Sequence, residues 1–153
     1  MLEFMKDVSA ETDFLIMGAE DEPYTLEHET KFLADTIASD QDMMITCEVD
    51  GEIAGNCEIS FNRRIKTRHR AGVAIALRQK YWSLGIGTAM FAELIAAARE
   101  RDIHQIELDY IEGNDRGRVL YEKMGFQICG EHPDAIRLAD GSLRKFINMR
   151  LVL

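Results

Sequence analysis

The segment YWSLGIGTAM, Tyr81 to Met90, carries two glycines one residue apart between an apolar run and a run of helical character. The preceding run, AGVAIAL, predicts a strand that ends near Leu77, and the following run predicts a helix that begins near Gly87. The first turn of a helix has unpaired N–H groups and a positive potential from the helix dipole. The segment therefore predicts either an anion-binding loop or a plain turn between a strand and a helix.

Two common phosphate-binding signatures do not fit this segment. The loop of nucleotide hydrolases needs a Lys-Ser/Thr pair after its last glycine, but Thr88-Ala89 follows Gly87 here. The dinucleotide fingerprint needs three glycines and an acidic residue after the next strand, whereas this segment has two glycines in a short chain. Glycine would still let a phosphate approach the backbone closely, and Thr88 could add a hydroxyl donor.

The rest of the chain predicts a mixed order of helices and strands, without a regular βαβ alternation. A helix is expected over 21–39, with Thr25 as its N-cap and with Phe32, Leu33 and Ile37 at helical spacing. A hairpin is expected over 42–61 around Asp50-Gly51, a dipeptide that suits a type I′ turn. The further expected elements are a central strand over 71–77, a helix over 88–102, a strand over 104–111, a helix over 114–125 and a closing strand pair over 126–153.

The length and charge of the chain limit its class. With 153 residues it fits one domain, taken as 1–153, and its net charge of −9 argues against nucleic acid as a partner. Residues 1–50 contain 14 acidic and 2 basic side chains, and residues 51–153 contain 13 and 16. This division fits either solvated helix faces or two sub-sites that prefer ligands of opposite charge.

No membrane, secretion or metal signal is evident in the sequence. No apolar run approaches the roughly 20 residues of a membrane helix, and the N-terminus lacks a basic region followed by an apolar core. Cys47, Cys57 and Cys129 are odd in number and lack metal-like spacing. We therefore expect buried free thiols, no bound metal and a cytoplasmic location.

A second segment, NDRGRVLYEKMGF from Asn114 to Phe126, joins an asparagine to a Leu-Tyr-Glu-Lys-x-Gly-Phe pattern. Together with YWSLGIGTAM it resembles the GCN5-related N-acetyltransferase (GNAT) superfamily in its small bacterial form, over about Met43 to Leu153. The resemblance implies an α/β (α+β) fold with a mostly antiparallel central sheet, flanking helices and a splayed strand pair. The N-terminal MLEFMKDVSAETDF starts within what would be the first helix, so either the first strand of the family is absent or the chain is a shortened form.

The resemblance implies acetyl-CoA as cosubstrate. Its pantetheine arm would pair with the backbone of Ile75, Ala76 and Leu77, and Asn114 would either contact this arm or cap a helix. The loop has no basic side chain, and its Trp82 stands where the family often has Arg or Gln. Arg116, Lys80 or Lys123 would therefore assist the diphosphate, which would rest on Trp82, Ser83, Leu84, Gly85, Ile86, Gly87 and Thr88.

Tyr121 would lie near the sulfur as a general acid, or would be a buried aromatic with a structural role. Similar sequences often carry a glutamate base where this chain has Gly72. The alternation of the next strand places Glu107 and Asp109 on the face opposite Ile106 and Leu108, which makes them candidate bases. Acidic residues of the GAEDEP segment, or a proton path through water without a single base, are open alternatives.

The expected function is transfer of an acetyl group from acetyl-CoA to a primary amine, by direct attack through a tetrahedral intermediate. The acidic N-terminal third, including Glu20, Asp21 and Glu22, would line the amine site, and the more basic remainder would carry the nucleotide. The alternative is an acetyl-CoA-binding sensor or interaction module on the same fold, with weak or no turnover. A homodimer is compatible with the resemblance, and small amino acids, polyamines, aminoglycosides and protein N-termini are all open as acceptors.

Overall fold

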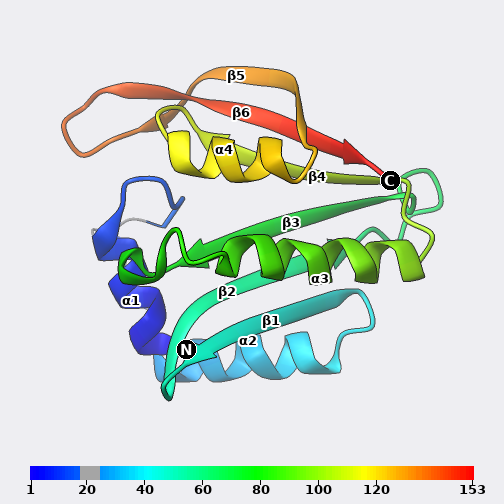
Figure 1. Ribbon diagram of the computed structural model, residues 1–153, viewed down its shortest axis with the longest axis horizontal. Coiled ribbons are helices and arrows are strands. Elements are labelled where there is room, and N and C mark those ends of the chain that lie inside the picture. Colours follow the sequence, from blue (N-terminus) through cyan, green and yellow to red (C-terminus); the bar gives the residue numbers. More distant parts are fainter. Residues whose placement is uncertain (18–24) are drawn as a thin grey trace.

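A six-stranded sheet in the order β1-β2-β3-β4-β6-β5 organises the molecule (Figure 1). The structure is a computed structural model, which describes residues 1–17 and 25–153. The helices are α1 (Leu2–Glu11), α2 (Leu26–Ala38), α3 (Ile86–Glu100) and α4 (Asp115–Lys123), with a short 3-10 turn η1 (Gln79–Tyr81). The strands are β1 (Asp42–Val49), β2 (Glu52–Phe61), β3 (Arg70–Leu77), β4 (Gln105–Ile111), β5 (Gln127–Arg137) and β6 (Leu143–Val152). The predicted mixed order and closing strand pair are confirmed.

Local signals in the sequence explain several of these boundaries. Asp50 and Gly51 both have positive φ angles, 52° and 82°, as a type I′ hairpin turn requires. The Thr25 hydroxyl accepts a hydrogen bond from the His28 backbone N–H at 3.1 Å and caps α2. Gly125 follows α4 with a φ angle of 95°, the left-handed conformation that commonly ends a helix.

The parallel pair β3–β4 is the irregular part of an otherwise antiparallel sheet. The two strands pair only at Arg70↔Gln105, Ala71↔Ile106 and Gly72↔Glu107. Beyond Gly72 they diverge, as Figure 1 shows, while β3 stays paired with β2 and β4 stays paired with β6. The predicted splay is therefore present, and it leaves backbone groups of both strands facing the gap without a strand partner.

The two faces of the sheet carry different side chains. One face packs against α3 and α4 (Figure 1), and its core includes Ile59, Leu94 and Ile106, each at most 1% exposed. The opposite face lies toward α2 and presents polar residues of alternate strand positions, among them Asp42 and Glu58.

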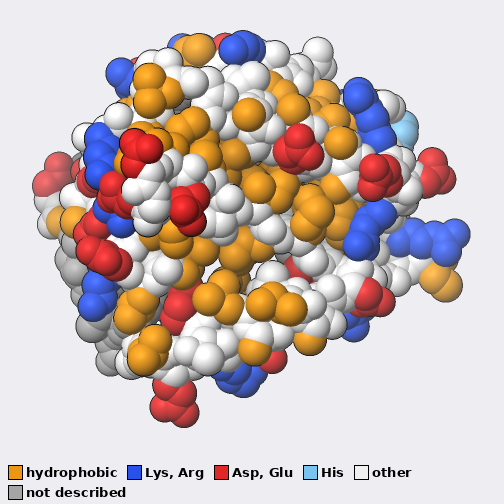
Figure 2. Space-filling view, turned by 60° about the horizontal axis from the view of Figure 1, so that its bottom comes forward, with side chains coloured by type: hydrophobic (Ala, Val, Ile, Leu, Met, Phe, Trp, Pro, Cys, Tyr) orange, Lys and Arg blue, Asp and Glu red, His pale blue; other side chains and the backbone are white. Residues whose placement is uncertain are grey.

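The sequence pattern of α2 does not predict its buried face. Phe32 and Ile37 were expected on an apolar stripe, but they are 41% and 86% exposed. The buried residue of this helix is Glu29, and Thr36, which shares its face at i+7, lines a hollow above the sheet. Because the sheet beneath α2 is polar, apolar side chains of α2 have little to pack on. Figure 2, in which the bottom of Figure 1 is turned forward, shows hydrophobic side chains gathered across the middle of the view.

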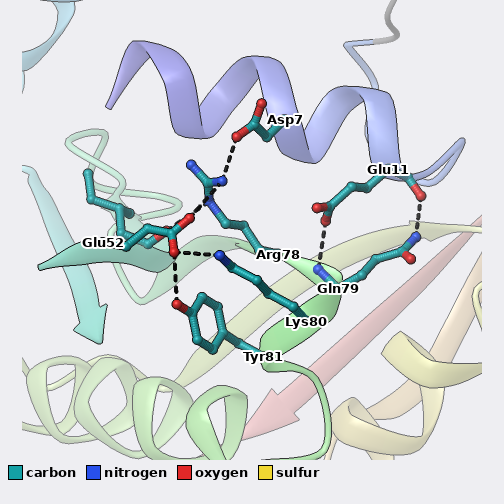
Figure 3. A network of polar contacts seen from close by, with 8 residues as sticks. Asp7, Glu11, Glu52, Arg78, Gln79, Lys80 and Tyr81 are labelled. Atoms are coloured by element: carbon teal, nitrogen blue, oxygen red, sulfur yellow. Dashed lines mark hydrogen bonds and ion pairs between the residues drawn. The ribbon is translucent and has the colours of Figure 1, made fainter. Parts of the chain in front are cut away.

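A polar network ties α1 to the end of β3 (Figure 3). The buried Arg78 guanidinium forms ion pairs with Asp7 and with Glu52, and it donates a hydrogen bond to the Ile53 carbonyl at 3.0 Å. The Gln79 backbone N–H donates to the Glu11 carboxylate at 2.6 Å. Within the described residues α1 is the first element, and β1 pairs with β2 alone.

The cysteines differ from the expectation in one respect. All three are free, but only Cys57 is buried, Cys47 is half-buried and Cys129 is exposed. Cys129 lies on β5, the edge strand of the sheet, and its thiol donates to the Asn148 carbonyl at 3.5 Å. Among the residues that the structure describes, no helix is long and apolar enough to cross a membrane.

Candidate active site

The glycine loop ends in an uncapped helix N-terminus. Gly85 is the N-cap of α3 with a φ angle of 85°, and no side chain caps the helix. The first turn contains no acidic residue, so the amides of 86–88 meet no side-chain acceptor among the described residues. Unpaired amides at the positive end of a 15-residue helix fit a diphosphate group.

The two glycines serve different purposes. A Cβ atom on Gly85 would meet nothing within 4 Å, so this position needs glycine for its left-handed backbone. A Cβ atom on Gly87 would lie 2.9 Å from Leu120 Cδ2. Gly87 therefore lets α3 and α4 approach each other, and a close approach of a phosphate to its backbone stays a prediction.

Two of the three cations expected near the loop contact it. Arg116 donates from Nη1 to the Ser83 hydroxyl at 3.0 Å, and its guanidinium lies 5.1 Å from the Trp82 ring centroid. Lys123 donates to the Thr88 hydroxyl at 3.2 Å. The third cation, Lys80, instead pairs with Glu52 on β2 (Figure 3). The positive side chains that contact the loop therefore come from α4.

Trp82 has a structural partner at the end of β3. Its indole N–H donates to the Leu77 carbonyl at 2.9 Å, so this carbonyl already has a hydrogen-bond partner. Ile75 and Ala76 align with Cys57 and Asn56 of β2 and have no partner strand on the side of β4. Of the three residues expected to pair with pantetheine, Ile75 and Ala76 therefore have backbone edges that face the gap without a strand partner.

Asn114 caps α4. Its side-chain oxygen accepts a hydrogen bond from the Gly117 backbone N–H at 2.9 Å, and a Cβ atom on Gly117 would lie 2.7 Å from the Asn114 side-chain nitrogen. The structural alternative for Asn114 is therefore confirmed, and Gly117 is the small residue that this cap requires.

Tyr121 lies in an aromatic cluster beside the diverging strands. The ring is 8% exposed and packs against Phe91, Phe126 and Tyr110 at centroid distances of 5.7, 6.4 and 5.9 Å. Tyr110 belongs to the part of β4 that has separated from β3. Burial raises the pKa of Tyr121 to about 12, so its phenol is protonated at neutral pH. The hydroxyl makes no hydrogen bond within the described chain, which leaves its proton available to a ligand.

The other face of the sheet carries a groove at the point of divergence. It has a volume of about 350 Å³ and crosses from β2 to β4; its lining residues are Glu58, Ser60, Gly72, Val73, Ala74, Glu107, Leu108 and Asp109. A second hollow of about 480 Å³ lies between α2 and the sheet and shares Glu58 and Ser60 with the first. The two hollows meet at these shared residues.

The two carboxylates predicted as candidate bases both have partners. Arg70 binds Glu107 through two nitrogens, one of them at 2.6 Å, and Gln105 donates to the same carboxylate. Burial raises the pKa of Glu107, but the hydrogen bonds from Arg70 and Gln105 outweigh this effect and the pKa is lowered overall. Asp109 accepts a hydrogen bond from the Asn148 side chain at 2.6 Å.

Glu58 is the groove carboxylate that the sequence did not single out. It aligns with Ala74 on β3, two residues beyond the last β3–β4 pair, and lines both hollows. Within the described chain it has neither an ion pair nor a side-chain hydrogen bond, and burial followed by the charge of Asp42 raises its pKa. Its alternation with Cys57 and Ile59 was a usable signal, but only the strand register places it at the splay.

The acidic candidates of the GAEDEP segment, Glu20, Asp21 and Glu22, lie outside the described residues, and one further buried glutamate lies on α2. Glu29 on α2 is 4% exposed, and its Oε1 has no hydrogen-bond partner in the described chain. No cluster of metal-binding side chains occurs among residues 1–17 and 25–153.

Known proteins share both the motifs and the fold. A model of the acetyltransferase (GNAT) family matches residues 9–126, which include the glycine loop and Tyr121. A GNAT-family acetyltransferase from Streptococcus pneumoniae has a TM-score of 0.90 and 27% identity, with 99% of this chain and 91% of that chain covered. For the ribosomal-protein-alanine N-acetyltransferase from Brucella melitensis the TM-score is 0.85 and the identity 24%, with 99% and 91% covered.

A protein from Salmonella typhimurium, solved with its cofactor acetyl-CoA, shows the same fold at a TM-score of 0.84 and 15% identity, with 99% of this chain and 86% of that chain covered. Acetyl-CoA is the cosubstrate of the matched family, and the uncapped α3, the open edge of β3 and the protonated Tyr121 fit it. The chain belongs to the acetyltransferase (GNAT) family.

Proposed function

We propose that this protein transfers the acetyl group of acetyl-CoA to a primary amine. The observation that carries the proposal is the divergence of β3 and β4, with an aromatic cluster around Tyr121 on one face and a carboxylate-lined groove on the other. Such an opening lets a thioester reach through the sheet while the amine approaches from the opposite side. The activity is assigned to one domain, residues 1–153, and a cytoplasmic location and a homodimer stay predictions.

The residues on the acetyl-CoA side would bind this cosubstrate and orient its thioester. The amides at the start of α3, with Arg116 and Lys123 beside the loop, would hold the diphosphate. The edges of Ile75 and Ala76 that face the gap would pair with the pantetheine amides. These contacts would fix the thioester at the divergence, where a well-oriented attack gains much of its rate from positioning.

The reaction joins the amine nitrogen to the acetyl carbon and breaks the carbon–sulfur bond, whose electron pair leaves with sulfur. One proton must leave the nitrogen and one must reach the sulfur. Tyr121 is proposed as the donor to sulfur, because its phenol is protonated, buried and unpaired within the described chain. A thiolate formed in the same apolar surroundings has a raised pKa as well, which favours the transfer.

One observation favours the alternative of a binding module without turnover. Gly72 occupies the strand position where similar sequences often carry a glutamate, and a Cβ atom there would meet nothing within 4 Å. This alternative predicts binding of acetyl-CoA without consumption.

A panel of primary amines, assayed by detection of free CoA thiol, separates the two functions. We expect thiol release that depends on one class of amine, together with a rise in melting temperature on adding acetyl-CoA. A thermal shift without thiol release across the panel would favour the binding module, and the absence of both would contradict an acetyl-CoA site.

A further inference from the structure

Glu58 differs from the other carboxylates of the groove in its surroundings. Glu107 is held by Arg70 and Gln105, and Asp109 is hydrogen-bonded by Asn148. Glu58 is half-buried and has no cation or hydrogen-bond donor on its carboxylate among the described residues. A carboxylate that is already paired accepts a proton poorly, whereas an unpaired and partly desolvated one accepts it well.

The position of Glu58 also suits a proton acceptor. It aligns with Ala74, in the part of β3 that has left β4, so it borders the gap itself. The neighbouring Ser60 aligns with Gly72, whose missing side chain leaves the groove open beside Glu58. Tyr121 packs on the face of α3 and α4, so the proton donor and this carboxylate approach the gap from opposite sides of the sheet.

We propose that Glu58 is the general base of acetyl transfer and takes the proton that the acceptor ammonium must lose. The inference rests on the proposed acetyltransferase function. The carboxylate removes one proton from the ammonium, the nitrogen lone pair forms the bond to the acetyl carbon as the carbon–sulfur bond breaks, and the proton on Glu58 returns to solvent after the product leaves. The second proton that nitrogen loses on becoming an amide balances the proton that Tyr121 gives to sulfur. A primary alkyl amine has a pKa of about 10.4 in water, so it needs this step near neutral pH.

Burial, followed by the charge of Asp42, raises the pKa of Glu58 above that of an ordinary glutamate. Asp42 on β1 is ionised more readily than usual, because hydrogen bonds from Ser39 and Ser60 lower its pKa, and its charge acts on Glu58. The remaining charged side chains that line the two hollows with Glu58 are Asp35, Arg63, Glu107 and Asp109. Arg63 pairs with Asp40 and Asp35 pairs with Lys31, so neither is committed to Glu58.

The test compares Glu58→Gln with the wild-type enzyme on two acceptors that differ in basicity. With an alkyl amine at neutral pH, kcat/KM should fall by about 10²–10⁴-fold, the range that one general base contributes. With an amine that is already unprotonated at neutral pH, such as an aryl amine or hydroxylamine, the loss should be far smaller. For the alkyl amine, the loss should also shrink as the pH rises toward the pKa of the amine.

A control variant and an affinity measurement show whether a loss of activity in Glu58→Gln comes from the missing base. The matched control is Glu48→Gln, an exposed glutamate on the adjacent strand β1, which should leave all rates unchanged. The affinity of Glu58→Gln for acetyl-CoA, measured by thermal shift, should equal that of the wild type. Equal losses on both acceptors, or no loss on either, would overturn the role of Glu58. An absence of wild-type thiol release with every amine would instead overturn the proposed function.

Discussion

The two faces of the sheet meet at the β3–β4 divergence but are built in different ways. The α3 and α4 face takes its site from two continuous segments, Tyr81–Met90 and Asn114–Phe126, and packs them into an aromatic core. The α2 face takes its groove from single residues of β2, β3 and β4 that lie far apart in the chain. The first face offers backbone amides and a neutral phenol, and the second offers carboxylates.

Under the proposed function, this difference separates the side of the sheet that binds acetyl-CoA from the side that binds the amine. A loop and a helix N-terminus recognise a diphosphate through backbone groups, which any sequence of the right local shape provides. A groove made of isolated side chains can change one residue at a time without disturbing that loop. The comparison therefore suggests that substitutions on the α3 and α4 face alter cosubstrate handling, and those on the α2 face alter amine handling.

The largest effect on the α3 and α4 face is expected from Tyr121→Phe, which tests whether this face handles the cosubstrate. Removing the phenol should lower kcat by about 10²-fold or more, because the sulfur loses its proton donor. The affinity for acetyl-CoA and the melting temperature should change little, since the ring and its packing are kept. Tyr110→Phe, which alters the neighbouring ring, should have a much smaller effect on kcat. Steady-state kinetics and isothermal titration measure both, and unchanged turnover of Tyr121→Phe would remove Tyr121 from the acid role.

The two glycines test which part of the loop belongs to the ligand and which to the core. Gly87→Ala should lower the free energy of unfolding by about 1–3 kcal/mol through its contact with Leu120, and leave acetyl-CoA affinity nearly intact. Gly85→Ala costs about 1–2 kcal/mol of left-handed backbone strain and should also weaken acetyl-CoA binding, because it distorts the loop.

Thermal unfolding and titration with acetyl-CoA separate these two effects. A change of about 1 kcal/mol in the free energy of unfolding shifts the melting temperature of a chain of this size by roughly 2–4 °C. In the double variant Gly87→Ala with Leu120→Ala, the loss of stability should be smaller than the sum of the single losses. An additive loss would contradict a steric contact between the two positions.

The smallest expected effect is a difference in pH dependence between Glu58 and Glu107. The pKa of Glu58 is raised in the folded protein by burial, so its stabilising contribution is present below the ordinary pKa and is lost as the pH rises through the raised value. The pKa of Glu107 is lowered, so its contribution is present above the ordinary pKa and is lost as the pH falls.

Denaturant unfolding between about pH 4 and pH 7 checks this contrast. Relative to wild type, Glu58→Gln should gain stability as the pH rises, and Glu107→Gln should lose stability over the same range. Parallel profiles of the two variants would mean that the two carboxylates do not differ in their surroundings.

Short-range signals predicted much of the cosubstrate side. A helix cap was one of the candidate roles of Asn114 at the start of the expected helix, and the structure confirms that role. The end of the strand near Leu77 and the start of the helix near Gly87 were both placed from the sequence, and the structure adds the short 3-10 turn η1 between them. The pattern was less informative for Phe32 and Ile37, because an apolar stripe does not reveal whether the surface beneath the helix is apolar.

The sequence by itself determined the order of elements, the turn at Asp50-Gly51 and the uncapped start of α3, because each depends on residues within one or two turns of chain. Only the tertiary structure decided that Gly87 meets Leu120, that Arg70 neutralises Glu107 and that Glu58 is left unpaired at the splay. These contacts join residues distant in sequence, and strand register and helix packing, which no local pattern fixes, determine which of them meet.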